Sequence, residues 1–187
     1  MQLYAIRDAA LKSKRAVYTI QQLANLIKAG KAVAKVYSSR LVKKGLAKRI
    51  LRGKISFAED DHVIGSQLSE PCYISLNSAL LFHSLIMQVP ANVECVTTKN
   101  SRRYPALGLV YHKIPASLFY GYEKYEKAGS YVFVADPEKA LIDAVYLNVI
   151  SKETAGELSA RVDRKKLSAY LSRATGRGRK KLERWLL

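Results

Sequence analysis

The sequence predicts an α+β protein in two parts, an N-terminal winged helix-turn-helix followed by a small α+β domain with a basic helical C-terminus. Apolar residues recur at helical spacing through the first 45 residues and then give way to a short hairpin pattern. From residue 71 onward, β-rich runs alternate with helical ones. The charge is also uneven, because residues 1–54 hold 14 of the 32 Lys and Arg residues and a single acid, Asp8.

The composition limits the class of protein. A chain of 187 residues that is 49% hydrophobic can bury one large core or two small ones. A formal net charge of +17 favours a polyanionic partner, nucleic acid first and an anionic membrane or acidic protein second. Two cysteines exclude a disulfide framework and fit a reducing compartment. The most apolar stretch, 79–89, is too short to span a bilayer, so we expect a soluble cytoplasmic protein without a membrane partner.

The first helix is expected where Leu3, Ile6 and Ala10 recur at helical spacing. A second helix starts at residue 20, because Thr19 and Gln22 have the spacing of a capping box. Its apolar stripe is Ile20, Leu23, Ala24 and Ile27.

A third helix follows Gly30 and ends at Gly45, which suits a left-handed C-terminal cap. Its expected core face is Val33, Tyr37 and Leu41. Two short helices joined by a tight turn, with another helix beneath them, are typical of a helix-turn-helix.

A hairpin is predicted directly after the third helix. Residues 46–51 and 54–58 are joined by Arg52-Gly53, and a two-residue turn ending in Gly is typical of hairpins. A basic hairpin in this position indicates a wing that lies along a phosphate backbone. Residues 1–62 are therefore predicted to form a winged helix-turn-helix DNA-binding domain.

The helical wheel and the hairpin select the candidate contacts to DNA. Lys35 and Ser39 are the best candidates for base contact, because Lys suits guanine and Ser either donates or accepts. The other basic residues would hold phosphates, and for any single lysine a solvated surface position is the alternative. The full candidate set is Lys31, Lys35, Ser38, Ser39, Arg40, Lys43, Lys48, Arg49, Arg52 and Lys54.

The acidic run Glu59-Asp60-Asp61 and the Gly, Ser and Pro residues after it predict a linker before a second domain at 70–187. In that domain we expect a helix from Ser75 to about Met87, with Ser75 as its cap. Another helix starts at Pro137 with Asp136 as its cap. Strands are expected at 93–98, 107–114 and 131–135, and a last helix at 165–174.

Several segments resemble the AbiEi-like antitoxin family of type IV toxin–antitoxin systems, whose members are also described as transcriptional regulators. The similar segments cover residues 3–150. They are Leu41 with Lys44-Gly45-Leu46, Arg52-Gly53, Tyr73-Ile74-Ser75, Ser78-Ala79-Leu80, His83-Ser84-Leu85, the strand 93–98, Arg102-Arg103-Tyr104, the strand ending near His112, and the step 134–143 that contains Asp136-Pro137-Glu138-Lys139.

This resemblance implies a winged helix that binds and represses the promoter of its own operon, commonly at inverted repeats, which suits a homodimer. It also implies a second domain that acts against a nucleotidyltransferase-like toxin. The family carries no catalytic residues and no cofactor, so no enzymatic activity is expected. The C-terminal tail is shorter than in the family, which leaves open a regulator without a toxin partner.

Other chemistry has weak support in the sequence. His62, His83 and His112 are scattered, and neither Cys72 nor Cys95 has a second Cys at metal-ligand spacing. A nuclease with Asp136 and Glu138 at a metal would need a lysine two residues after Glu94, and Val96 stands there. We therefore expect no metal.

Two basic or aromatic segments leave alternatives open. The tyrosines at 120, 122, 125 and 131 suit either packing, a protein-binding patch or stacking on single-stranded bases. The tail is a candidate second nucleic-acid contact, or a helix whose Leu182, Trp185 and Leu186 dock on the protein or a dimer mate. Its basic residues are Arg177, Arg179, Lys180, Lys181 and Arg184.

Two functions from other classes also stay open. One is an interaction protein or adaptor that neutralises a nucleotidyltransferase-like toxin, with DNA binding secondary. The other is an RNA-binding module, which the basic ends and tyrosines favour although no RNA-binding motif is present.

Overall fold

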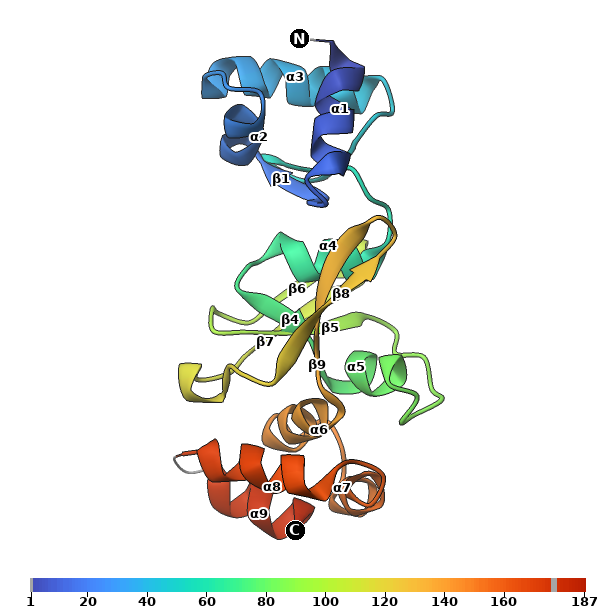
Figure 1. Ribbon diagram of the computed structural model, residues 1–187, viewed down its shortest axis with the longest axis vertical. Helices are drawn as coiled ribbons and strands as arrows, with labels where there is room; N and C mark the ends of the chain where they lie inside the picture. The colour runs from blue at the N-terminus through green and yellow to red at the C-terminus, as the bar shows by residue number, and fades with distance from the viewer. Residues whose placement is uncertain (1, 176–177) are drawn as a thin grey trace. The chain divides into compact units, whose positions relative to one another are not determined.

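The computed structural model describes residues 2–175 and 178–187 and mixes helices with two β-sheets (Figure 1). Contacts divide the chain into two compact units. Unit 1 is Met1–Leu68 with Tyr125–Val132, and unit 2 is Ser69–Lys124 with Phe133–Leu187. The predicted mixture of α and β structure is therefore confirmed. Among the described residues, no helix combines the length and apolar character needed to cross a membrane.

In unit 1, the helices α1, α2 and α3 precede the last two strands of a three-stranded sheet. The helices pack around a core that includes Ile6, Leu23, Leu41 and Ile55, all of which are almost fully buried. The three strands are antiparallel, in the order β1-β3-β2. The elements are α1 (Leu3–Lys12), β1 (Val17–Thr19), α2 (Ile20–Leu26), α3 (Lys31–Lys43), β2 (Lys48–Leu51), β3 (Lys54–Ser56) and α4 (Asp61–Leu68).

The predicted capping box at the start of α2 is confirmed. The backbone N–H of Gln22 donates to Thr19 Oγ1 at 3.2 Å, and the backbone N–H of Thr19 donates to Gln22 Oε1 at 2.8 Å. Two otherwise unsatisfied donors at the helix start are thereby paired, which is why this boundary could be read from the sequence.

The predicted linker after residue 58 is wrong, because α4 occupies most of it. Asp60 Oδ1 accepts the backbone N–H groups of His62 at 2.9 Å and Val63 at 3.0 Å. The acidic run therefore begins a helix, where carboxylates are stabilised by free N–H groups and by the helix dipole. Val63, Ile64 and Leu68 of α4 are buried.

Unit 2 is built on a six-stranded sheet with the order β6-β7-β5-β4-β9-β8. The β5–β7 and β4–β9 pairs are parallel, and the β4–β5 and β6–β7 pairs are antiparallel. The strands are β4 (Cys72–Ile74), β5 (Val93–Thr97), β6 (Arg102–Tyr104), β7 (Leu109–Lys113), β8 (Tyr122–Lys127) and β9 (Ser130–Ala135). The outer part of the β8–β9 hairpin belongs to unit 1. The helices are α5 (Leu76–Phe82), α6 (Pro137–Tyr146), α7 (Lys152–Ser159), α8 (Arg164–Arg173) and α9 (Arg179–Leu186).

Helix α5 is shorter than predicted and its cap differs. It ends at Phe82 rather than near Met87, because Ser84 turns to a φ of 57° and Leu85 closes the end by donating to Leu80 O at 2.8 Å. Ser75 stands at the start of the helix, but its hydroxyl does not cap the helix. It donates instead to Asp143 Oδ2 at 2.7 Å.

Helix α6 carries a buried ion pair inside unit 2. Lys139 and Asp143 are both fully buried and paired one helical turn apart, and Tyr73 OH also donates to Asp143 Oδ2 at 3.0 Å. Burial lowers the pKa of Lys139, whereas burial and the charge of Asp143 raise the pKa of Tyr73. Asp143 accepts several donors because a buried carboxylate without partners would be strongly unfavourable.

Candidate nucleic-acid interface

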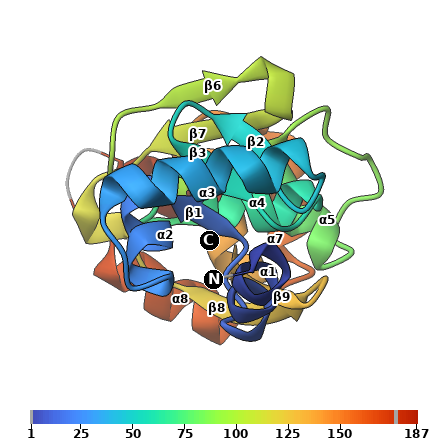
Figure 2. The ribbon, with the colours of Figure 1, turned by 90° about the horizontal axis from the view of Figure 1, so that it is seen from above.

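Helix α3 presents a basic face to solvent. Figure 2 shows this helix along its length, with α1 and α2, which contact it, beside it. Its buried residues are Ala34, Ser38 and Leu41. The exposed candidates of this helix are Lys31, Lys35, Ser39, Arg40 and Lys43.

The core face of α3 is rotated from the predicted one. Ser38 is 1% exposed, so its assignment as a DNA contact is wrong. Val33 was predicted in the core but is 45% exposed, and Val36 beside it is 49% exposed. The small side chains of Ala34 and Ser38 allow α3 to pack closely on its neighbours. The helical-wheel prediction instead places the larger apolar residues in the core. The two exposed valines are thus surface residues that the helical-wheel prediction does not identify.

The hairpin of β2 and β3 extends the basic surface beyond α3. Gly53 has a φ of 75°, a conformation that suits glycine in a two-residue turn. Lys54 is half-buried and its Nζ donates to the carbonyl of Leu68 at 2.5 Å, so this lysine is held within unit 1. Lys48, Arg49 and Arg52 are exposed.

The exposed basic side chains of α3 and the hairpin form no ion pair in the part of the chain that the structure describes. Two acids of unit 1 pair with other lysines, Glu126 with Lys14 at 2.9 Å and Asp60 with Lys127 at 3.3 Å. Cations without nearby acids create a positive potential that attracts a polyanion. Within residues 2–175 and 178–187, no ion pair forms at Lys31, Lys35, Lys43, Lys48, Arg49 or Arg52.

The basic tail has a different role in the structure. Leu182 and Leu186 of α9 are each 1% exposed, and α9 contacts α6, α7 and α8, so docking on the protein is confirmed for these two leucines. Lys181 Nζ donates to the carbonyl of Val145 and to Asn148 Oδ1, both at 2.5 Å. Arg179 pairs with Glu183 at 2.7 Å.

Of the five tail candidates, Lys180 and Arg184 are exposed and unpaired among the described residues. Arg177 lies outside the described residues. The exposed basic side chains of α9 are therefore fewer than the sequence suggests.

The tyrosines of the second predicted domain take part in packing. Tyr120 is buried and its hydroxyl donates to the carbonyl of Tyr170 at 2.7 Å. The Tyr122 ring stacks on Tyr73 with centroids 4.7 Å apart. These contacts favour packing over base stacking for these two residues.

The acids around residue 136 are engaged with a lysine of α8. Asp136 accepts Tyr170 OH at 2.5 Å instead of capping α6, and Lys166 Nζ lies 3.0 Å from Asp136 and 3.6 Å from Glu138. Asp136 does occupy the predicted N-cap position of α6, but its side chain forms no capping hydrogen bond. The Asp136 carboxylate instead connects the start of α6 to α8.

Comparison of the chain with protein-family models found no match. Comparison with curated proteins also found none.

Proposed function

We propose that this protein is a transcriptional regulator that binds double-stranded DNA sequence-specifically through unit 1. Unit 1 would then be a winged helix-turn-helix, with α3 as the recognition helix and the β2–β3 hairpin as the wing. Its main support is the exposed row of unpaired cations on α3 and the hairpin. This surface offers contacts to phosphates on both elements.

The exposed valines of α3 add support for base contact. Val33 and Val36 lie on the exposed side of α3 near Lys35. Apolar side chains in this position do not help solubility, so they call for another explanation. In a major groove, apolar side chains contact the methyl group of thymine, while Lys contacts guanine. Such a helix combines phosphate binding with readout of base edges.

The resemblance to AbiEi-like antitoxins suggests the biological setting of this binding. On that basis we infer an autorepressor of a type IV toxin–antitoxin operon that binds its own promoter as a homodimer. A second candidate function is binding of a nucleotidyltransferase-like toxin by unit 2. It is favoured by Phe82, Met87 and Val89, which are 39%, 89% and 76% exposed. These three residues lie within eight positions of the chain, and exposed apolar patches are typical of protein-binding surfaces.

Substitution of two lysines tests the DNA-binding surface. Lys35→Gln combined with Lys43→Gln should weaken binding to the DNA upstream of the gene, and each lost phosphate contact should flatten the log–log salt dependence by about 0.9. Lys152→Gln with Lys165→Gln removes the same charge from exposed positions in unit 2 and is the matched control. Equal effects of both pairs would remove α3 from the interface.

A further inference from the structure

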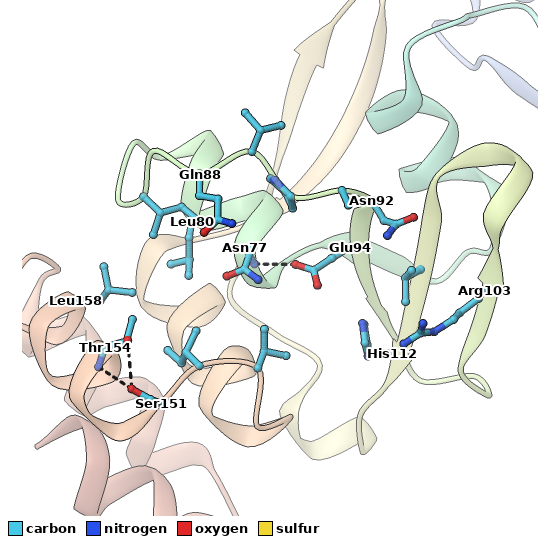
Figure 3. A pocket seen from close by; sticks show the side chains of 17 residues that line it. Asn77, Leu80, Gln88, Asn92, Glu94, Arg103, His112, Ser151, Thr154 and Leu158 are labelled. Atoms are coloured by element: carbon cyan, nitrogen blue, oxygen red, sulfur yellow. Dashed lines mark hydrogen bonds between the residues drawn. The ribbon is translucent and has the colours of Figure 1, made fainter.

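A separate cavity lies in unit 2 on one face of its sheet. Its volume is about 700 Å³, and it is lined by residues of β5, β6, β7 and α5 and of segments 86–92 and 149–158 (Figure 3). Cavities of this size are typical of small-molecule sites.

The strand register places one acidic and one basic residue at opposite sides of this cavity. Glu94 pairs with Val110 across β5 and β7, and Arg103 pairs with Val110 across β6 and β7. Paired residues point to the same face of a sheet, and neighbouring strands are about 4.8 Å apart. The backbones at Glu94 and Arg103 are therefore about 10 Å apart, with both side chains on the cavity face.

Both charged groups lack a counter-ion. The carboxylate of Glu94 is half-buried and accepts the backbone N–H of Asn77 at 3.0 Å, yet it forms no ion pair among the described residues. Burial raises its pKa. Arg103 is exposed, and its side chain likewise forms neither an ion pair nor a hydrogen bond in the described part of the chain. A bound molecule that supplies a cation and an anion would satisfy both residues.

The cavity is lined by both polar and apolar residues. His112 points into the cavity between the two charged residues, and its Nε2 is enclosed without a hydrogen-bond partner among the described residues (Figure 3). The amides of Asn77, Gln88 and Asn92 add polar groups. The rest of the lining is mostly apolar and includes Leu80, Val89, Val149, Ile150 and Leu158, while Ser151 and Thr154 add two hydroxyl groups.

We propose that this cavity binds a small zwitterion with an apolar side chain, either an amino acid or a dipeptide. Its ammonium group pairs with Glu94, its carboxylate pairs with Arg103, and its side chain packs against the apolar wall formed by Leu80, Val149 and Leu158. This inference does not depend on the proposed DNA binding, and its test contains no DNA.

Calorimetric titration of the full chain with defined probes tests the charge requirement. Leucine, phenylalanine and leucyl-leucine are the zwitterions, N-acetyl-leucine lacks the ammonium group, and leucinamide lacks the carboxylate. At least one zwitterion should bind saturably, and both blocked compounds should bind at least about tenfold more weakly, because each loses one charge-assisted contact. Whichever of the amino acids or the dipeptide binds with the higher affinity identifies the class of ligand. Absence of zwitterion binding, or equal binding of a blocked compound, would overturn the proposal.

Substitutions locate the binding in the cavity. Arg103→Gln and Glu94→Gln should each weaken binding by at least about tenfold, while the Gln oxygen can still accept the Asn77 N–H. Arg102→Gln is the matched control, because Arg102 is exposed on the same strand but pairs with Tyr111 and faces the opposite side of the sheet. Unchanged binding in Arg103→Gln, or an equal loss in Arg102→Gln, would place the ligand elsewhere and refute the assignment.

Discussion

At the scale of single residues, two neighbouring serines of α3 have opposite surroundings. Ser38 is buried and its Oγ has no hydrogen-bond partner among the described residues, whereas Ser39 is exposed. An unpaired buried hydroxyl is unfavourable, so Ser38 does not stabilise the core through polar contacts.

Ser38→Ala should therefore leave the free energy of unfolding within about 1 kcal/mol of the parent or raise it, helped by the better helix propensity of Ala. Urea unfolding measures this change. DNA affinity should stay unchanged in Ser38→Ala and fall in Ser39→Ala. A loss of stability well above about 1 kcal/mol would show that the Ser38 hydroxyl makes a stabilising hydrogen bond and would contradict the prediction.

Burial and the nearby charge of Arg103 lower the pKa of His112. The unfolded chain takes up a proton at this residue near pH 6.5, where the folded protein does not, so His112 makes stability fall as the pH drops below about 7. His112→Gln should flatten this fall in unfolding measurements between pH 7.5 and 5.5. The pKa of His62 is also lowered, so part of the fall should remain. An unchanged pH profile would contradict the prediction.

At the scale of elements, α4 ties two distant parts of unit 1 together. Gln67 Oε1 accepts the backbone N–H groups of Ala16 at 2.9 Å and Val17 at 3.2 Å. Its Nε2 donates to Ser130 Oγ and to the carbonyl of Tyr131, both at 2.9 Å. One buried amide therefore joins α4 to the start of β1 and to the tip of the β8–β9 hairpin.

Gln67→Met should destabilise the protein by about 2–4 kcal/mol, because it leaves several buried backbone groups unpaired at similar side-chain volume. Chemical unfolding gives the value. Gln21→Met, at an exposed position of α2, is the control and should change stability by less than about 0.5 kcal/mol. A similar loss in both variants would refute the role of Gln67.

Helix α9 was open to two interpretations, and its buried leucines favour a structural role. Removal of residues 178–187 should lower the melting temperature, since it uncovers the apolar surfaces that Leu182 and Leu186 cover. DNA affinity measured below the new melting temperature should be unchanged. Lost affinity with an intact melting profile would instead assign the tail to DNA contact.

Local signals explain which elements were predictable. The start of α2 followed from a capping box, and the α6 start at Pro137 from the restricted φ of proline. The strands β4 and β6 are only three residues long, which is too short for an alternating pattern to mark them, and β4 also depends on pairing with the distant strand β5. The candidate site was predictable as a charge concentration, but the rotation of α3 depended on packing. The register that joins Glu94 and Arg103 had no local signal.

At the scale of the whole molecule, the positive charge is concentrated rather than spread. Residues 1–54 hold 14 Lys and Arg residues with one acid, and Lys31, Lys35, Lys43, Lys48, Arg49 and Arg52 form no ion pair in the described part of the chain. Mixed charges are enough for solubility, so a surface of one sign indicates a polyanionic ligand. Electrostatic attraction alone is insensitive to sequence, which is why salt dependence must be measured together with sequence preference.

The most direct measurement is the affinity of the purified chain for its own upstream duplex and for a scrambled duplex of the same composition, across a salt series. We predict that the affinity for the upstream duplex exceeds that for the scrambled duplex by at least about 10³-fold near physiological salt. Equal affinities that both fall steeply with salt would contradict it, and would reduce DNA to one polyanion among others.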